Sequence, residues 1–303
     1  MKIKVLKFGG TSVGSIEAIK RSADIIHDWS KKSKVIAVLS AMSGETDRLI
    51  NLTKSFSKNP NPIDFDNAIS SGENVSCALM SICLNNQKIK AKSLLSWQIP
   101  IITSSEHMKS RILSINKKFL YDELENFEVL LIPGFQGINN KGELTTLGRG
   151  GSDTSAVAVA AAMETECIIY TDVEGVFTTD PNIVPKAKKI NKISYEEMLE
   201  LASQGAKVLQ TRSVELAMRK NTKLSVRSSF KPKKIGTMIT DEKSVLENNT
   251  VSGITYSKDE AKITLSRVQD KPGVSSKIFG PLAKGNINVC LLYTSPSPRD
   301  SIR

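Results

Sequence analysis

Apolar and polar residues along the chain follow two periods, and each period predicts a different kind of element. Residues 3–8 alternate between apolar and polar side chains, which is typical of a strand. Residues 15–29 carry apolar side chains at helical spacing, at Ile16, Ile19, Ala23 and Ile26. Residues 35–39 are apolar throughout, as expected of a strand buried in a parallel sheet. The chain therefore begins with a strand, a glycine turn, a helix and a second strand.

The same patterns continue to about residue 230. They predict further strands at 99–103, 129–133, 166–170 and 224–228, and further helices at 74–84, 153–163 and 194–202. Residues 54–64 are polar and contain proline and asparagine, which favours a surface loop, and Gly142 marks a hairpin. Strands that alternate with helices predict a large α/β domain.

A glycine-rich stretch, TTLGRGGSDTSA at 145–156, precedes the helix predicted at 153–163. Glycines let backbone N–H groups approach an anion, and a helix N-terminus favours negative charge. Ser152 or Asp153 is the expected N-cap, and Arg149 adds a cation with bidentate geometry. The stretch therefore predicts a phosphate or carboxylate site, although a tight turn before a buried alanine-rich helix explains it equally well.

A second glycine turn, Gly9-Gly10, follows the first strand and favours the anion site. It matches neither the Walker loop nor the dinucleotide-binding fingerprint. Lys7, at the strand end, is placed to hold its ammonium over phosphates bound by the turn. The alternative is a solvated lysine at a sheet edge.

Other candidate residues follow the later strands, because ligands bind at the carboxyl ends of parallel strands. Ser40 and Thr46 follow the strand at 35–39, and either is also an ordinary loop hydroxyl or helix cap. Glu73, in a helix's first turn, is either a partner of the helix dipole or an acceptor for a ligand's ammonium group. Asp172 follows the strand at 166–170 and is a candidate for holding a nucleotide or its magnesium, and Lys207 is a candidate for a phosphate contact.

Composition narrows the functional classes. The chain has 303 residues, 40% hydrophobic and 24% charged, with a formal net charge of +11. The basic residues are scattered and not interleaved with aromatic residues, which argues against nucleic-acid binding. The four cysteines form no C-x-x-C pair, and Cys77 and Cys83 are expected to be buried thiols. With two histidines we expect no metal site in the protein, and with no signal peptide or membrane span we expect a cytoplasmic location.

From residue 251 on the pattern changes. A strand at 261–266, a turn at 270–274, a helix at 275–283 and a strand at 287–289 are the front half of a ferredoxin-like module. Residues 290–303 break the pattern with proline and serine, and we expect them not to be native to the protein.

Together these motifs resemble the aspartate kinases of the amino-acid kinase family. The matching segments run in order along the chain: KFGGTSV at 7–13, SAMSG at 40–44, SGE at 71–73, GFQG at 134–137, TTLGRGGSDTS at 145–155, YTDV at 170–173 and VRSSF at 226–230. The resemblance implies a three-layer αβα kinase domain with a mainly parallel sheet at 1–245. It also implies that 246–289 is an incomplete ACT regulatory module, with the tail at 290–303 outside it.

The resemblance also implies an activity. Such an enzyme transfers the γ-phosphate of ATP, with Mg²⁺, to the β-carboxylate of L-aspartate, the first step towards lysine, threonine and methionine. Lys7, Arg149 and Asp172 would be catalytic. The nucleotide would be held by Lys7, Phe8, Gly9, Gly10, Thr171, Asp172, Phe177, Asn182 and Lys207. The amino acid would be held by Ser40, Thr46, Glu73, Arg149, Gly150, Gly151 and Ser152.

Some positions depart from the family pattern. Glu174 stands where the family usually has Asp, Asn182 replaces a frequent Arg, and Gln210-Thr211 replaces a common His-Pro. The paired ACT modules of the family bind lysine or threonine, often across a dimer, and the incomplete module argues against retained feedback control. Three alternatives stay open: another amino-acid kinase such as glutamate 5-kinase, a non-catalytic amino-acid sensor, and a truncated fragment that is folded in its kinase domain but poorly soluble.

Overall fold

The structure is a computed structural model, and it describes residues 2–99, 101–148, 150–206, 208–241, 253–255, 263, 265, 268, 271–285 and 289. Contacts divide the chain into two units, residues 1–257 and 258–303. The domain boundary predicted at residue 245 lies outside the described residues.

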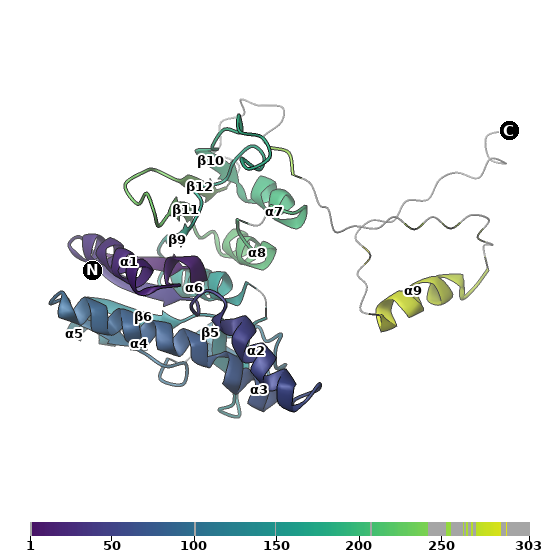
Figure 1. Ribbon diagram of the computed structural model, residues 1–303, viewed down its shortest axis with the longest axis horizontal. Helices are drawn as coiled ribbons and strands as arrows, with labels where there is room; N and C mark the ends of the chain where they lie inside the picture. The colour runs from purple at the N-terminus through teal and green to yellow at the C-terminus, as the bar shows by residue number, and fades with distance from the viewer. Residues whose placement is uncertain are drawn as a thin grey trace. The chain divides into compact units, whose positions relative to one another are not determined.

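Within the described part of the first unit, eight strands form the main sheet in the order β10-β12-β11-β9-β1-β2-β6-β3 (Figure 1). In that order their bounds are Lys192–Ser194, Thr237–Thr240, Leu224–Ser228, Cys167–Thr171, Ile3–Phe8, Lys34–Leu39, Val129–Pro133 and Ala91–Ser93. Every pair of neighbours is parallel except β11 and β12. The predicted α/β fold with a mainly parallel sheet is confirmed.

Helices cover both faces of this sheet and give it two cores. On one face α1 (Ile16–Ser30) and α4 (Ser71–Asn86) pack against the side of β1 that carries Leu6 and Phe8. On the other face Val5 belongs to a core shared with α5 (Lys117–Asn126), α6 (Gly151–Ala162), α7 (Tyr195–Ser203) and α8 (Thr211–Lys220). Leu6 and Val5 enter different cores because successive residues of a strand point to opposite faces.

A second, smaller sheet has the order β5-β4-β7-β8. Its strands are Ile112–Ile115, Ile101–Thr103, Gln136–Ile138 and Leu144–Thr146. β7 and β8 form the predicted hairpin, and Gly142 in its turn has a φ of +77°, which favours glycine. β8 leads directly into the glycine-rich stretch, so the small sheet delivers that loop to the main sheet.

The surface loop predicted at 54–64 is partly wrong. α2 (Glu45–Phe56) extends into its first residues, and α3 (Pro62–Ile69) begins before its end. Asn61 caps α3 by accepting a hydrogen bond from the N–H of Ile63, and Pro62 occupies the first helical position, where a missing N–H costs nothing. Proline and asparagine mark a helix start here and not only a loop.

In the second unit the predicted helix at 275–283 is confirmed as α9 (Val274–Lys284). The strands predicted at 261–266 and 287–289 fall mostly on residues outside the described ones, and the tail at 290–303 falls wholly outside them. The incomplete regulatory module therefore stays a prediction.

Two further expectations concern cysteines and membranes. Cys77 and Cys167 are buried free thiols, but Cys83 is only half-buried, because α4 presents it near the rim of its core. Among the described helices none is long and apolar enough to cross a membrane.

We expect the Leu130→Ala variant to lose about 2–5 kcal/mol of unfolding free energy, because Leu130 is fully buried in β6 and its removal leaves a cavity. Leu113→Ala, at a side chain that is 66% exposed, is the control and should change the unfolding free energy little. Urea unfolding measures both, and equal losses would contradict this assignment of the core.

Candidate functional site

The main sheet brings the predicted strand-end residues to one edge. β1 lies between β2 and β9 and is parallel to both, with Phe8 in register with Leu39 and Tyr170. The turns after these strands therefore begin side by side at the carboxyl edge of the sheet, where ligands bind in open parallel sheets. The predicted residues that lie there are Gly9, Gly10, Ser40, Thr171 and Asp172.

Lys7 lies at this edge in an ion pair. Its Nζ is 2.6 Å from Oδ1 of Asp153, and the two side chains are only 11% and 10% exposed. A Cβ added to Gly9 would lie 3.3 Å from that Nζ, so the ammonium group lies directly beside the glycine turn. A solvated lysine at a sheet edge is ruled out here, because β1 is central and the side chain is enclosed.

Asp153 is a site residue that the sequence analysis missed, having considered it only as a helix cap. The N-cap of α6 is Gly150 and not Ser152 or Asp153, because glycine adopts the required φ of +69° and lets the helix begin earlier. Asp153 is therefore inside the first turn, where its carboxylate is favoured by the helix dipole. The sequence did offer a signal for this ion pair, because Lys7 precedes the glycine turn at 9–10 and Asp153 follows the glycines at 150–151.

The first turn of α6 packs closely against the end of β6. A Cβ on Gly134 would lie 2.8 Å from both Cβ and Oγ of Ser152, which leaves no room for a side chain there. Gly151 is equally close to Phe135, whose N–H donates to Oγ of Ser155 at 3.1 Å. The glycines predicted to approach a ligand are thus also needed for packing. Arg149 and Lys207 lie outside the described residues, and their roles stay predictions.

Glu73 is a buried carboxyl group in the first turn of α4, with 3% of its surface exposed. Its Oε1 accepts a hydrogen bond from the N–H of Ala41 at 3.2 Å, just after β2. Its Oε2 is buried and has no hydrogen-bond partner among the described residues. Burial raises the pKa of Glu73 to about 8, against the lowering effect of the Ala41 N–H. A buried carboxyl with a spare acceptor fits a ligand cation better than a mere dipole partner.

The two hydroxyl residues predicted near β2 lie on either side of the turn after that strand. Ser40 is half-buried and its N–H donates to the carbonyl of Phe8 at 3.1 Å, so it follows β1 closely. Thr46 is half-buried in the first turn of α2, whose N-cap, Gly44, has a φ of +79°. A Cβ on Gly10 would lie 3.1 Å from the carbonyl oxygen of Ala41. The glycine turn after β1 therefore packs against the turn after β2.

The predicted nucleotide residues follow β9. Oγ1 of Thr171 donates to Oδ1 of Asp172 at 2.9 Å, and the Thr171 carbonyl accepts from the N–H of Ser229 after β11 at 2.8 Å. Asp172 and Asn182 are exposed, and Phe177 is half-buried and bridges to Lys189. Thr171 and Asp172, which are adjacent in the sequence, therefore lie at the end of β9, whereas Asn182 lies in an exposed loop.

Glu174, the departure from the usual aspartate, lies in the same region. Its carboxylate contacts Lys231 at 2.5 Å and Lys234 at 3.2 Å, and hydrogen bonds from these lysines lower its pKa. The longer side chain of glutamate is thereby engaged by the loop after β11. Among the described residues no three His, Cys, Asp or Glu side chains gather closely enough to hold a metal ion.

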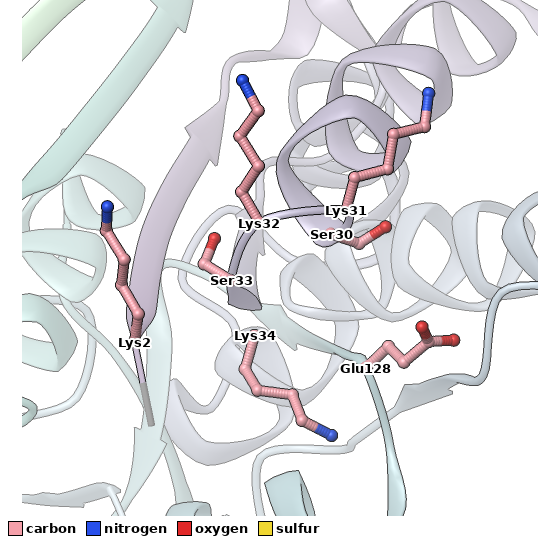
Figure 2. A pocket seen from close by; sticks show the side chains of 7 residues that line it. All are labelled: Lys2, Ser30, Lys31, Lys32, Ser33, Lys34 and Glu128. Atoms are coloured by element: carbon pink, nitrogen blue, oxygen red, sulfur yellow. The ribbon is translucent and has the colours of Figure 1, made fainter.

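A lysine-lined hollow lies at the end of α1, and Figure 2 shows its side chains. In this view the side chains of Lys2, Lys31 and Lys32 extend side by side in the same general direction and do not converge on a common point, and that of Lys34 extends the other way. Lys34 donates instead to the carbonyl of Phe127 at 3.0 Å. Lysines at a helix C-terminus complement its dipole, so this hollow is not a second candidate site.

The model of the "Amino acid kinase family" matches residues 2–228. The chain is 48% identical to an aspartate kinase of Pseudomonas putida, over 96% of this chain and 72% of the relative. It is also 48% identical to an aspartokinase of Helicobacter pylori, over 95% of this chain and 72% of that relative. Among solved structures it is similar to E. coli aspartokinase III in complex with aspartate and ADP, with 27% identity and a TM-score of 0.77 over 97% of this chain and 77% of the other. A structure of that enzyme in complex with lysine and aspartate is 26% identical in sequence to this chain. Its TM-score is 0.75, over 97% of this chain and 77% of the other.

We expect the stability of the wild-type chain to fall as pH rises between 4.5 and about 8, relative to Glu73→Gln. Between the ordinary pKa of 4.5 and the folded value of about 8, the folded chain holds a proton that the unfolded chain releases. Each pH unit in that window then lowers the free energy of unfolding by up to about 1.4 kcal/mol. The Glu73→Gln variant has no such dependence, because its side chain does not titrate. Urea unfolding at pH 5, 6, 7 and 8 measures it, with the exposed Glu125→Gln as control. Parallel slopes in all three proteins would contradict the burial of a neutral carboxyl.

Proposed function

The chain belongs to the amino acid kinase family and within it to the aspartate kinases, and from this premise we propose how its own residues transfer the γ-phosphoryl group of ATP to the β-carboxylate of L-aspartate. One observation carries the proposal. A buried cation, Lys7, and a buried carboxyl with an unpartnered oxygen, Glu73, are held at the ends of neighbouring parallel strands, β1 and β2.

The phosphates of ATP would lie along the turn after β1. Lys7 supplies a positive charge beside the turn at Gly9 and Gly10, where neither residue has a side chain to block the approach of a phosphate to the backbone. Thr171, Asp172, Phe177, Asn182 and Lys207 are assigned to the nucleotide. Magnesium belongs to the nucleotide substrate, and when bound it neutralises charge on the phosphate oxygens.

The acceptor would lie between α4 and α6. Oε2 of Glu73 is available to accept a hydrogen bond from the substrate's ammonium group. Arg149, Gly150, Gly151 and Ser152 are assigned to a carboxylate at the start of α6, where unpaired N–H groups and the helix dipole favour negative charge. Ser40, in the turn after β2, and Thr46, at the start of α2, are assigned to the same substrate.

The chemistry needs positioning and charge neutralisation more than proton transfer. A carboxylate is already a nucleophile, so the reaction requires no general base. Lys7 is assigned to counter the charge on the transferring phosphoryl group, and Asp153 to hold that ammonium in place at 2.6 Å before the phosphates arrive. The loss of feedback control by lysine or threonine, and a dimeric state of the intact protein, stay predictions. The relative solved with lysine bound is longer, and this chain covers 77% of it.

We expect ADP release from MgATP to depend on L-aspartate and to be near background with L-glutamate or with no amino acid. The aspartate-dependent rate tests the proposed function. A preference for glutamate would favour a glutamate 5-kinase-like enzyme. Binding of an amino acid without turnover would favour a non-catalytic sensor, and either result would contradict the proposal.

We expect Lys7→Ala to lower kcat about 100-fold or more while leaving the folded state intact, because the variant removes a charge assigned to the transition state. Lys4→Ala is a matched control on the same strand, since Lys4 also forms a partly buried ion pair, with Glu166 at 2.5 Å. Steady-state kinetics and circular dichroism measure the two effects. If Lys7→Ala keeps kcat within about threefold of the wild type, the role assigned to Lys7 is wrong.

A further inference from the structure

The glycine-rich loop between β8 and α6, residues 147–151, contains two backbone positions that only glycine adopts readily. Gly148 has a φ of +77° and Gly150 a φ of +69°. Such a loop has many accessible conformations when it is free, so its shape must be imposed by neighbouring groups. Two charged side chains from outside the predicted site lie at its start: Asp66 bonds to Thr146, the residue just before the loop, and Arg212 bonds to Leu147, its first residue.

Asp66, on α3, contacts Thr146, the last residue of β8 before the loop. It is fully buried, and its carboxylate accepts from the N–H of Thr146 at 3.1 Å and from Oγ1 of Thr146 at 2.6 Å. The same carboxylate contacts Nδ1 of His107 at 2.8 Å and accepts from the N–H of Met108 at 3.1 Å. A buried carboxylate that receives this many hydrogen bonds to two separate segments fixes them relative to each other.

The segment that contains His107 and Met108 is itself bonded to the loop. The N–H and Oγ of Ser110 donate to the carbonyl of Thr146, at 3.0 and 2.9 Å. A Cβ on Gly148 would lie 2.9 Å from the carbonyl oxygen of Met108. Residues 107–110 therefore lie directly against the loop, and Asp66 holds both.

Arg212 lies in the first turn of α8, which follows the loop in the sequence, whereas Asp66 precedes it. Its guanidinium donates to the carbonyl of Leu147 at 2.6 Å and to the carbonyl of Ser110 at 2.7 Å. Burial, and then the nearby charge of Arg111, lower the pKa of Arg212, as expected of a cation withdrawn from water. Next to it, Gln210 packs so closely on Gly150 that a Cβ there would lie 2.1 Å from Cγ of Gln210.

We propose that Asp66 and Arg212 are positioning residues that fix the loop at 147–151 for the acceptor amino acid. The inference rests on the proposed function, in which this loop binds the acceptor's carboxylate. Asp66 bonds to Thr146, His107 and Met108, and Arg212 bonds to Leu147 and Ser110, so both side chains act on the start of the loop and on residues 107–110. The ion pair beside the phosphate turn after β1 is made by two other residues, Lys7 and Asp153. Loss of either positioning residue therefore impairs the use of aspartate and leaves the use of ATP largely unchanged.

The test uses Asp66→Asn, which keeps the shape of the side chain and removes its charge, and Arg212→Gln, which cannot donate to both carbonyls in the same geometry. Arg212→Lys restores the charge but not the two-pronged contact. Asp64→Asn on α3 and Arg219→Gln on α8 are matched controls at exposed positions of the same helices. For each protein we would measure kcat, KM for aspartate, KM for ATP and the unfolding temperature.

We expect KM for aspartate to rise about tenfold or more in Asp66→Asn and Arg212→Gln, with KM for ATP within twofold, and partial recovery in Arg212→Lys. The controls should match the wild type. Equal rises in both KM values, or a lower unfolding temperature with unchanged kinetics, would overturn the positioning role and leave the proposed function standing. A wild-type chain without aspartate-dependent ADP release would instead overturn the proposed function, and the acceptor role of the loop with it.

Discussion

The buried ion pair between Lys7 and Asp153 is the interaction on which the rest of the candidate site depends. Lys7 belongs to β1, whose carboxyl end lies beside those of β2 and β9. Asp153 belongs to the first turn of α6. Removing one partner of such a pair leaves an uncompensated charge in a poorly solvated place. The pair therefore joins the strand that precedes the turn assigned to phosphates to the helix that follows the loop assigned to the acceptor, and phosphoryl transfer depends on the relative position of two such groups.

Glu73 shows the opposite arrangement, a charge site left incomplete. One of its oxygens is bonded to the backbone after β2 and the other is buried without a partner among the described residues. Such a group destabilises the free protein, and a bound ammonium group would remove that cost. The buried neighbour Cys77, one turn further along α4, has its pKa raised by burial and by Glu73, so the surroundings of this carboxyl are poorly solvated throughout. The site thus combines a paired cation with a buried carboxyl group whose second oxygen has no partner among the described residues.

Local patterns predicted the elements that lie at the centre of the fold. β1, β2, β6, β9 and β11 were predicted nearly to the residue, because strands show either a continuous apolar run, as in β2, or an alternation of apolar and polar residues, as in β1. The start of α3 was read as loop, because proline and asparagine mark turns and helix starts alike. Asp66 and Arg212 were missed because each contacts backbone groups far away in the sequence, at Thr146 and Leu147, and backbone partners leave no trace in residue type.

The sequence by itself determined which glycine turns are candidates for an anion site and which strands precede them, since glycine conformation and hydrophobic period are local properties of the chain. It also carried the resemblance to the family, because the motifs are contiguous and ordered. Only the tertiary structure decided that Lys7 pairs with Asp153, that Glu73 is buried with a raised pKa, and that Asp66 and Arg212 hold the loop at 147–151. The reason is physical: burial and pairing depend on the residues that the fold brings together from distant parts of the chain, and a charged residue looks the same in the sequence whether it is solvated or enclosed.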